Sequence, residues 1–500
     1  MDRFTGILGI FVLLGLAWLM SYDKKNIPFK IIFWGIGLQL LFGVIIIKEN
    51  YLSFLGMGLL TVLIIIYQYS QYSKEKKLKP THIITPILLI SSIIYCVYYN
   101  YTGGVIMHSF SEGIQSFLNL SDYGSKFLFG NLADYNYFGP WGSNYDFPNK
   151  GTWPGFGFQF AFKVLPTIIF FGGMMSVLYY LGIIQIIINS LSKFMRWTIG
   201  TSGAETLSCS ANVFVGQTEA PLLIKPFLNK MTKSELTTIM VGGFATIAGG
   251  VLAGVSAMGI DIGYLVAASV MSAPAALVVG KIIFPEKEKS ETSGDTQLPD
   301  IKVGSNVVEA ASNGIIDGLK LAVNVGAMLI GFIAIIAVLD SILNWLDSII
   351  DGSLLKGIYY QYAASGFSPT TGEFSGYFPG SLQTLFGSLL KPLAFIMGAP
   401  ASDMEPLGNL LGLKISLNEF VAYSQLGEYI KAGLLTPKGQ IIATYALCGF
   451  ANFSSIGIQI GGISAIAPKR KEDLARVALK AMFGGAIASW ITATIAGILI

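Results

Sequence analysis

The sequence predicts an all-α polytopic membrane protein. Hydrophobic residues make up 53% of the 500 residues and charged residues only 12%, whereas soluble proteins carry about 25% charged residues. This is too few charged residues for the surface of a water-soluble protein. Apolar side chains must therefore face lipid. Apolar segments long enough to cross a bilayer recur along the chain, and two further segments, 206–228 and 384–426, are shorter or interrupted.

Charge and cysteine content exclude other classes. A net charge of +3 is too small to indicate a nucleic-acid partner. The three cysteines lie far apart in apolar or small-residue stretches, which is typical of packing residues, and two histidines cannot supply a zinc site. The chain has no Gly-x-Ser-x-Gly, His-Glu-x-x-His or phosphate-binding Gly-Lys-Ser/Thr string. We therefore expect no enzyme and no cofactor.

Ten apolar segments are candidate spans. They are 4–20, 31–47, 53–70, 83–100, 164–190, 236–256, 262–280, 321–346, 440–460 and 481–500. The first has no small-x-small cleavage site and more apolar segments follow it, so we interpret it as a transmembrane helix and not as a signal peptide.

Basic residues between the spans predict the orientation. Lysines cluster at 24–25 and 74–79, and alternation of the first four spans places both clusters on one side. Because cytoplasmic loops are enriched in Lys and Arg, that side is expected to be cytoplasmic and the N-terminus external. A polar loop is expected at 281–302.

Three further segments have distinct compositions. Residues 130–157 and 358–380 are rich in Gly, Pro and aromatic residues, which favours irregular structure at the membrane surface, with a ligand lid as the alternative. Residues 104–127 combine apolar residues at helical spacing with interspersed charges, which indicates an amphipathic interfacial helix.

The interrupted segment near 212–221 contains one charge, Glu219, together with Gly216, Pro221 and a run of polar side chains. A re-entrant hairpin or a loop outside the membrane would both explain this composition. The uncharged run 236–260 that follows is rich in glycine. This density favours close helix packing or local unwinding that frees carbonyls for a cation.

A similar pattern occurs near the C-terminus. Glu419 is the only charge in 415–427, and the uncharged run 440–468 contains Asn452 and Ser455. Three residues apart, these two are expected to share one helical face and to meet one ligand, or to act as polar contacts between helices.

The two regions look like copies of one element. Residues 243–247 and 449–453 read Gly-Phe-Ala-Thr-Ile and Gly-Phe-Ala-Asn-Phe, and each follows an interrupted segment with a lone acid. Paired interrupted segments in corresponding halves indicate the midplane binding site of a secondary transporter.

At these residues the sequence resembles the concentrative nucleoside transporters. The most specific strings are NVFVGQTEAPLLIKPF, MTKSEL, GGFATIAGGVLAG, NEFVAYSQL and CGFANFSSIGIQIGGI. The resemblance covers the first two spans and the chain from about Gly104 onward, so the spans at 53–100 and the two aromatic loops look like additions. It implies inverted repeats with two re-entrant hairpins and two partly unwound helices. It also implies a homotrimer in which each subunit has a scaffold and a mobile transport part.

This resemblance divides the chain into five regions. Residues 1–103 hold N-terminal helices, and 104–205 the interfacial helix, an aromatic loop and a scaffold helix. Residues 206–284 hold the first hairpin and following helices, 285–383 a cytoplasmic loop, scaffold helix and inserted loop, and 384–500 the second hairpin and C-terminal helices.

The resemblance also implies individual roles. Gln217, Thr218 and Glu219 would face the nucleobase, with Val251 packed nearby. Glu419, Asn452 and Ser455 would hold the ribose hydroxyls, and Phe450 would pack against the nucleoside. No Lys or Arg interrupts 212–224, 415–427 or 440–468, which disfavours phosphorylated substrates.

Asn212, Thr246 and the carbonyls of Val215 and Ile247 would bind sodium by the same resemblance. The expected function is sodium-coupled import of nucleosides such as uridine by alternating access. The expected location is the cytoplasmic (inner) membrane, with lipid as the surrounding partner. A proton-coupled importer is the principal alternative, because Glu219 or Glu419 could titrate, and a channel is the alternative from another class.

Overall fold

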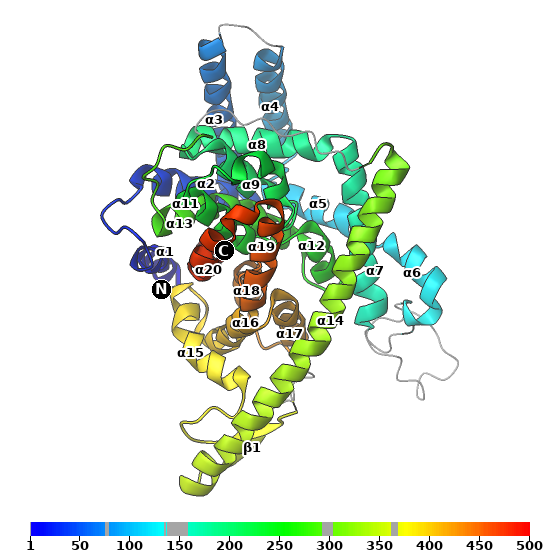
Figure 1. Cartoon of the computed structure of the whole chain (residues 1–500), viewed down its shortest axis with the longest axis vertical. Helices are drawn as coiled ribbons and strands as arrows, with labels where there is room; N and C mark the ends of the chain where they lie inside the picture. The colour runs from blue at the N-terminus through cyan, green and yellow to red at the C-terminus, as the bar shows by residue number, and fades with distance from the viewer. Residues whose placement is uncertain (1, 76–79, 135–136, 138–158, 293–303, 362–368) are drawn as a thin grey trace.

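The computed structural model describes residues 2–75, 80–134, 137, 159–292, 304–361 and 369–500 (Figure 1). The helices of the first half are α1 (Asp2–Leu19), α2 (Phe29–Ile47), α3 (Tyr51–Glu75), α4 (Thr81–Tyr98), α5 (Gly103–Leu118), α6 (Ser121–Phe129), α7 (Phe160–Tyr180), α8 (Ile183–Ile199), α9 (Gly203–Ala211), α10 (Lys225–Leu228), α11 (Lys233–Ala245), α12 (Gly249–Ser256) and α13 (Ile262–Ile283). Those of the second half are α14 (Val307–Asp347), α15 (Leu382–Ile396), α16 (Met404–Ser416), α17 (Glu419–Lys431), α18 (Pro437–Leu447), α19 (Phe453–Ile466) and α20 (Lys471–Leu499).

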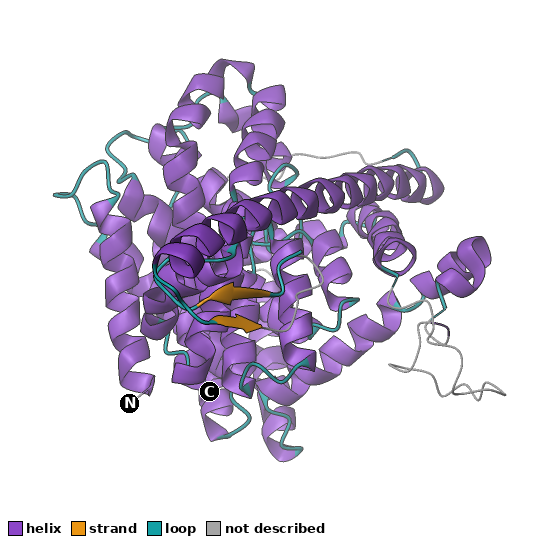
Figure 2. Ribbon diagram, turned by 90° about the horizontal axis from the view of Figure 1, so that it is seen from below, coloured by secondary structure: helices purple, strands orange, loops and turns teal. Residues whose placement is uncertain are grey.

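The predicted all-α fold is confirmed. The described strands are two three-residue segments, β1 (Tyr359–Gln361) and β2 (Gly372–Phe374), which pair antiparallel inside the loop after α14 (Figure 2). Eight helices of the described chain are long and apolar enough to cross a membrane. Most of the aromatic loop at 130–157, part of the loop at 358–380 and the end of the polar loop at 281–302 lie outside the described residues.

The core consists of helices that lie far apart in the sequence. α11, α13, α18 and α20 pack against one another, and α1 and α2 cover α13 and α20. Side chains of α13 and α20 are buried almost throughout. A membrane helix with this little exposed surface is surrounded by protein, so this bundle is the protein-enclosed core of the molecule.

The predicted span 164–190 is wrong. Helix α7 ends at Tyr180, Gly182 adopts a left-handed conformation (φ +78°), and α8 starts a new helix at Ile183. Hydropathy continues across this turn, so only the glycine marked it in the sequence. The predicted interfacial helix 104–127 is also two helices, α5 and α6.

The predicted span 440–460 is interrupted as well. α18 ends at Leu447 and α19 begins at Phe453, while residues 448–452 are non-helical. In the corresponding place of the first half, residues 246–248 separate α11 from α12. The partly unwound helices that the resemblance implied are therefore present in both halves.

Helices α3 and α4 project from the core as a hairpin (Figure 1). The Ser53 hydroxyl donates to the Ile45 carbonyl at 2.9 Å and accepts from the Gly103 amide at 2.8 Å, so the two ends of the hairpin meet. Tyr67 of α3 contacts Phe194 and Trp197 of α8. No described residue of α4 is buried, which is the exposure of a lipid-facing helix.

Candidate functional site

A cavity of about 700 Å³ lies where the interrupted segments of both halves face α7 and α14. All eight residues predicted to contact substrate line it. They are Gln217, Thr218, Glu219, Val251, Glu419, Phe450, Asn452 and Ser455. Four come from each half of the chain, so tertiary folding brings together residues that are up to 238 positions apart (455 − 217).

The second-half wall is organised around Asn452. Its amide nitrogen donates to Oε2 of Glu419 at 3.0 Å, and its Oδ1 accepts from the Ser455 amide at 2.8 Å. Asn452 is thus the N-cap of α19, and the prediction that Asn452 and Ser455 share one helical face is wrong. The cap instead turns the Asn452 amide toward Glu419, which Asn418 holds at the start of α17 by capping that helix.

The first-half wall is the turn between α9 and the short 3₁₀ helix Ala220–Ile224. The Gly216 amide donates to Oε2 of Glu219 at 3.0 Å, which folds the carboxylate over its own turn. Within the described chain, the buried Oε1 of Gln217 has no hydrogen-bond partner. An unpartnered amide oxygen beside a carboxylate can accept two further hydrogen bonds from a ligand.

Asn212 ends α9 and is 1% exposed, yet neither its Oδ1 nor its Nδ2 bonds to any described protein group. It packs on the last turn of α11, because a Cβ built on Gly242 would lie 3.4 Å from Nδ2. Thr246 caps the same turn and donates to the Gly242 carbonyl at 3.0 Å. The Gly249 amide bonds the Phe214 carbonyl at 3.2 Å, which joins the hairpin tip to the interruption.

The set of neutral oxygens at this point suits a hard monovalent cation. Within the described chain the Asn212 amide oxygen has no hydrogen-bond partner, the Thr246 hydroxyl donates its proton to Gly242 and keeps its lone pairs as acceptors, and Val215 and Ile247 are buried, non-helical residues. Buried polar atoms without partners are rare in native structures. A bound ion would satisfy them.

The two interruptions lie against each other. The Ser489 hydroxyl of α20 is within hydrogen-bond distance of the Cys448 carbonyl (2.7 Å) and the Ala245 carbonyl (3.3 Å). Gly449 has φ +124°, and an added Cβ would approach the Phe244 carbonyl oxygen to 2.6 Å. Only glycine fits both the conformation and the approach.

We therefore expect Gly449→Ala to abolish the transport that the resemblance implies and to lower the free energy of unfolding by about 1–3 kcal/mol, the usual cost of a strained backbone. Thermal unfolding in detergent and uptake in liposomes measure the two effects. Gly457→Ala in α19 is the matched control, because an added Cβ there meets no atom within 4 Å. Equal behaviour of the two variants would contradict this account.

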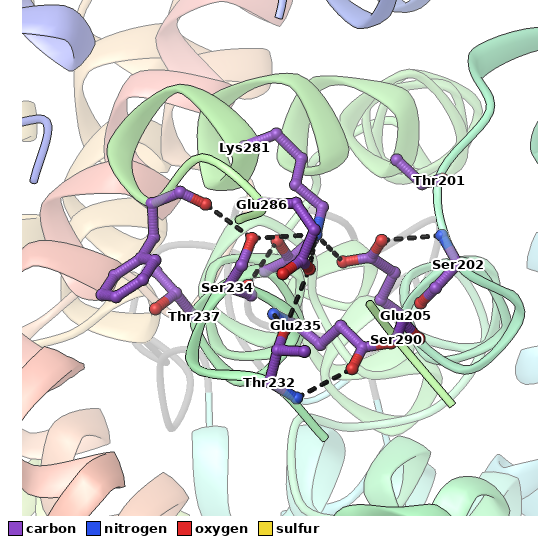
Figure 3. Close-up of polar contacts among 12 residues, drawn as sticks. Thr201, Ser202, Glu205, Thr232, Ser234, Glu235, Thr237, Lys281, Glu286 and Ser290 are labelled. Carbon is purple, nitrogen blue, oxygen red and sulfur yellow. Dashed lines mark hydrogen bonds and ion pairs between the residues drawn. The ribbon is translucent and has the colours of Figure 1, made fainter. Parts of the chain in front are cut away.

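A buried polar cluster anchors the other end of the first hairpin (Figure 3). The Lys281 ammonium lies 2.8 Å from Oε2 of Glu205 and 3.1 Å from Oε2 of Glu286. Oε1 of Glu235 accepts from the Ser290 hydroxyl at 2.6 Å. These contacts hold the segment that follows α13 against the N-termini of α9 and α11.

Removing the cation of this cluster has a predictable effect. Lys281→Met should lower the free energy of unfolding by about 3–5 kcal/mol, because it leaves the buried Glu205 carboxylate without its counter-charge. Lys230→Met, which breaks only the exposed pair with Glu291, should leave the unfolding temperature nearly unchanged. Similar unfolding temperatures for both variants would show that the cluster does not hold the hairpin.

Three family models match the chain. They are described as Na+ dependent nucleoside transporter N-terminus at 8–52, Nucleoside recognition at 161–261 and Na+ dependent nucleoside transporter C-terminus at 264–497. The nucleoside permease NupC of Helicobacter pylori is 40% identical over 402 residues, which cover 80% of this chain and 86% of that protein. The chain belongs to the concentrative nucleoside transporter family.

Other members of the family agree with this assignment. An uncharacterized transporter of Haemophilus influenzae is 43% identical over 385 residues, covering 75% of this chain and 81% of the relative. Sodium/nucleoside cotransporter 2 of mouse is 34% identical over 515 residues, but this chain spans only 63% of its length.

Solved structures of the family member CNTnw match along the whole chain. CNTnw in an inward-facing substrate-bound state is 32% identical with a TM-score of 0.77, covering 100% of this chain and 98% of that one. A variant of CNTnw in an outward-facing state has a TM-score of 0.76 at the same identity and coverage. The chain is thus a transporter and an integral, multi-pass membrane protein, as predicted.

Sequence reasoning missed the far wall of the cavity. α7 contributes Met175 and Tyr179, and α14 contributes Asp317 and Asn324. The last two are seven residues apart on α14, which places them on one face of that helix. The seven-residue spacing of these two polar residues was the sequence signal that could have indicated this wall. The predicted span 321–346 started too late to include Asp317.

Proposed function

We propose that this transporter is a sodium-coupled symporter that imports nucleosides across the cytoplasmic membrane by alternating access. The observation that carries the proposal is the convergence of eight polar or packing residues, four from each half, on one cavity, together with a buried asparagine, Asn212, that has no hydrogen-bond partner among the described residues. A site built from two interrupted segments is typical of secondary transporters.

In this proposal the two walls recognise different parts of the nucleoside. Glu419 and Asn452, already bonded to each other, receive the ribose: the carboxylate accepts from hydroxyls, and the Asn452 amide donates to them. Gln217, Thr218 and Glu219 face the base edge, while Val251 and Phe450 pack against its faces.

The charge of the cavity favours a neutral substrate. Its described lining includes Glu219, Asp317 and Glu419 but no Lys or Arg. A phosphate group would meet carboxylates with no cationic partner. We therefore propose nucleosides and not nucleotides as the substrate class.

Sodium would bind Asn212, Thr246 and the carbonyls of Val215 and Ile247. This place joins the hairpin tip to the interruption of α11–α12 through the Phe214–Gly249 hydrogen bond. An ion there would stabilise the tip that carries Gln217, Thr218 and Glu219, so cation and nucleoside binding are expected to be positively coupled.

We further propose that three copies of the chain form a homotrimer. The five sequence regions of each copy would make up a fixed scaffold and a moving part. The close packing of α7 on α14 supports a scaffold pair: a Cβ added to Gly172 would lie 2.7 Å from the Gly314 carbonyl oxygen. The buried bundle of α11, α13, α18 and α20 would move with both hairpins.

Uptake of radiolabelled uridine by the reconstituted protein tests the function. We expect an inward sodium gradient to drive accumulation, choline replacement to abolish it, and excess uridine monophosphate not to compete. Uptake that needs a pH gradient and not sodium would support the proton-coupled alternative, in which Glu219 or Glu419 carries the proton. Absence of transport for every nucleoside would refute the substrate class.

A further inference from the structure

The cavity adjoins only one half of the long helix α14. Helices α7 and α14 pack side by side and antiparallel (Figure 1): a Cβ added to Gly318 would lie 2.9 Å from Ile169, and one added to Gly326 would lie 3.4 Å from Leu165. Among the described residues of α14, those that line the cavity lie within 314–328. They belong to the N-terminal half of the helix, beside the C-terminal part of α7.

Contacts between loops identify the cytoplasmic face of the protein. Lys230 pairs with Glu291 at 3.0 Å, and Lys287 pairs with Asp23 at 2.6 Å. Arg470 donates to three carbonyls of the loop that holds Lys230. The basic loops that follow α1, α10, α13 and α19 thus meet on one face. Because cytoplasmic loops are enriched in Lys and Arg, this face is the cytoplasmic one.

Helix α14 begins on this same side of the membrane. The segment 293–303, which connects it to the cytoplasmic segment after α13, is polar and shorter than the about 20 residues that a bilayer crossing needs. Asp317 lines the cavity, yet its side chain is 73% exposed and lies 3.0 Å from the exposed Lys320 ammonium. The cavity therefore lies beside the cytoplasmic half of α14 (307–328) and opens to solvent near Asp317.

The two halves of α14 present different groups. Asp317 and Asn324 line the cavity from one face of the cytoplasmic half. From Val325 to Leu339 the sequence contains no polar residue. Beyond that stretch, each Asp, Ser and Asn before Asp347 already bonds to a backbone group; these residues are Asp340, Ser341 and Asn344. Polar groups that face a ligand are thus found on the cytoplasmic half of the described helix.

We propose that Asp317 and Asn324 are substrate-contacting residues of one transport state. They bind the nucleoside while the cavity faces the cytoplasm and lose contact with it when the cavity faces outward. Alternating access moves the hairpin tips along the α7–α14 scaffold, so in the outward-facing state these tips lie beside the apolar outer half of α14 (329–347). This inference rests on the proposed function and adds two substrate contacts that differ between the two sides of the membrane.

The chemistry of the pair suits a nucleoside. The Asp317 carboxylate accepts hydrogen bonds from hydroxyl or amino groups, and the Asn324 amide both donates and accepts. Seven residues of helix separate them by about 10 Å along the axis, so one elongated ligand can meet both. A ligand shifts a conformational equilibrium toward the state in which it makes more contacts. The pair therefore favours the loaded, cytoplasm-facing state and so the inward movement of the substrate.

Transport measured separately from each side of the membrane tests the inference. Right-side-out vesicles report uridine entry from the outer side, and inside-out vesicles report entry from the cytoplasmic side, with the coupling ion saturating on the side of entry. We expect Asp317→Ala to raise the cytoplasmic-side KM about tenfold, as expected for one lost hydrogen bond to a charged group, and the outer-side KM by less than about twofold. Asn324→Ala should raise the cytoplasmic-side KM about threefold, as expected for a neutral hydrogen bond.

Lys320→Gln is the matched control. It breaks the same exposed ion pair, but Lys320 is not among the residues that line the cavity, so both KM values should remain unchanged. Asp317 is exposed, so its variant should unfold at the same temperature as the unchanged protein.

For Asp317→Ala, an equal rise of KM on both sides, a rise confined to the outer side, or no rise would each overturn the inference and leave the proposed function standing. Failure of the unchanged protein to transport any nucleoside would instead overturn the proposed function, and the inference with it.

Discussion

Glu419→Gln is expected to reduce nucleoside uptake by about a hundredfold, because hydrogen bonds to a charged acceptor contribute about 1.5–3 kcal/mol and the proposed site places two ribose hydroxyls on this carboxylate. The carboxylate also accepts from the Asn452 amide at 3.0 Å. In the variant, rotation of the new amide to keep that bond leaves its NH₂ toward the ribose, where an acceptor is needed. The measurement is uridine uptake in liposomes, with uridine binding by calorimetry.

The matched control is Glu428→Gln. Glu428 lies on the same helix but is exposed and paired with Lys431, so its neutralisation should leave uptake nearly unchanged. Both proteins should show the same thermal unfolding and size-exclusion profile, since Glu419 lines a cavity and is not part of the α11–α20 bundle. Near-normal transport by Glu419→Gln would refute the ribose assignment.

Asn212→Ala is expected to raise the half-saturating sodium concentration by about tenfold or more, the effect of losing one ligand with about 1.4 kcal/mol of binding energy. The Asn212 amide is buried and has no hydrogen-bond partner among the described residues, so its removal breaks no hydrogen bond of the described structure and should not lower the unfolding temperature. Sodium titration of uridine uptake measures the effect.

Asn229→Ala serves as the control, because Asn229 is exposed just after the first hairpin and its change should leave the sodium dependence intact. The nucleoside affinity of Asn212→Ala at very high sodium should approach that of the unchanged protein. An unaltered sodium titration would contradict the site, and a protein that fails to fold would show that the asparagine has a packing role.

Local sequence signals identified the elements well. The repeated Gly-Phe-Ala strings lie at both helix interruptions. The capping boxes Ser202–Glu205 and Thr232–Glu235 at the starts of α9 and α11 are further local signals, which our prediction did not use. The residues predicted to contact substrate all line one cavity, whereas Asn212, Thr246 and Ile247, predicted to bind sodium, are not part of its lining. Capping residues, glycines and isolated acidic residues determine these features locally, so the sequence alone can predict them.

The packing of helices that lie far apart in the sequence could not be predicted in the same way. Hydropathy merged α7 with α8 and α18 with α19, because apolar character continues across a turn as readily as along a helix. The cavity wall formed by α7 and α14 was not predicted either, because Asp317 and Asn324 become cavity-lining residues only when other helices pack opposite them.

The sequence by itself determined a polytopic helical membrane protein, a two-fold repeated plan and the residues around which a nucleoside site is proposed. Composition, helix signals and repeated strings are properties of neighbouring residues. Only the tertiary structure decided the partners of the buried charges. Lys281 meets carboxylates, whereas Lys414 meets the carbonyls of a helix end. A lysine's role depends on the atoms around it once water is removed, and those atoms come from distant parts of the chain.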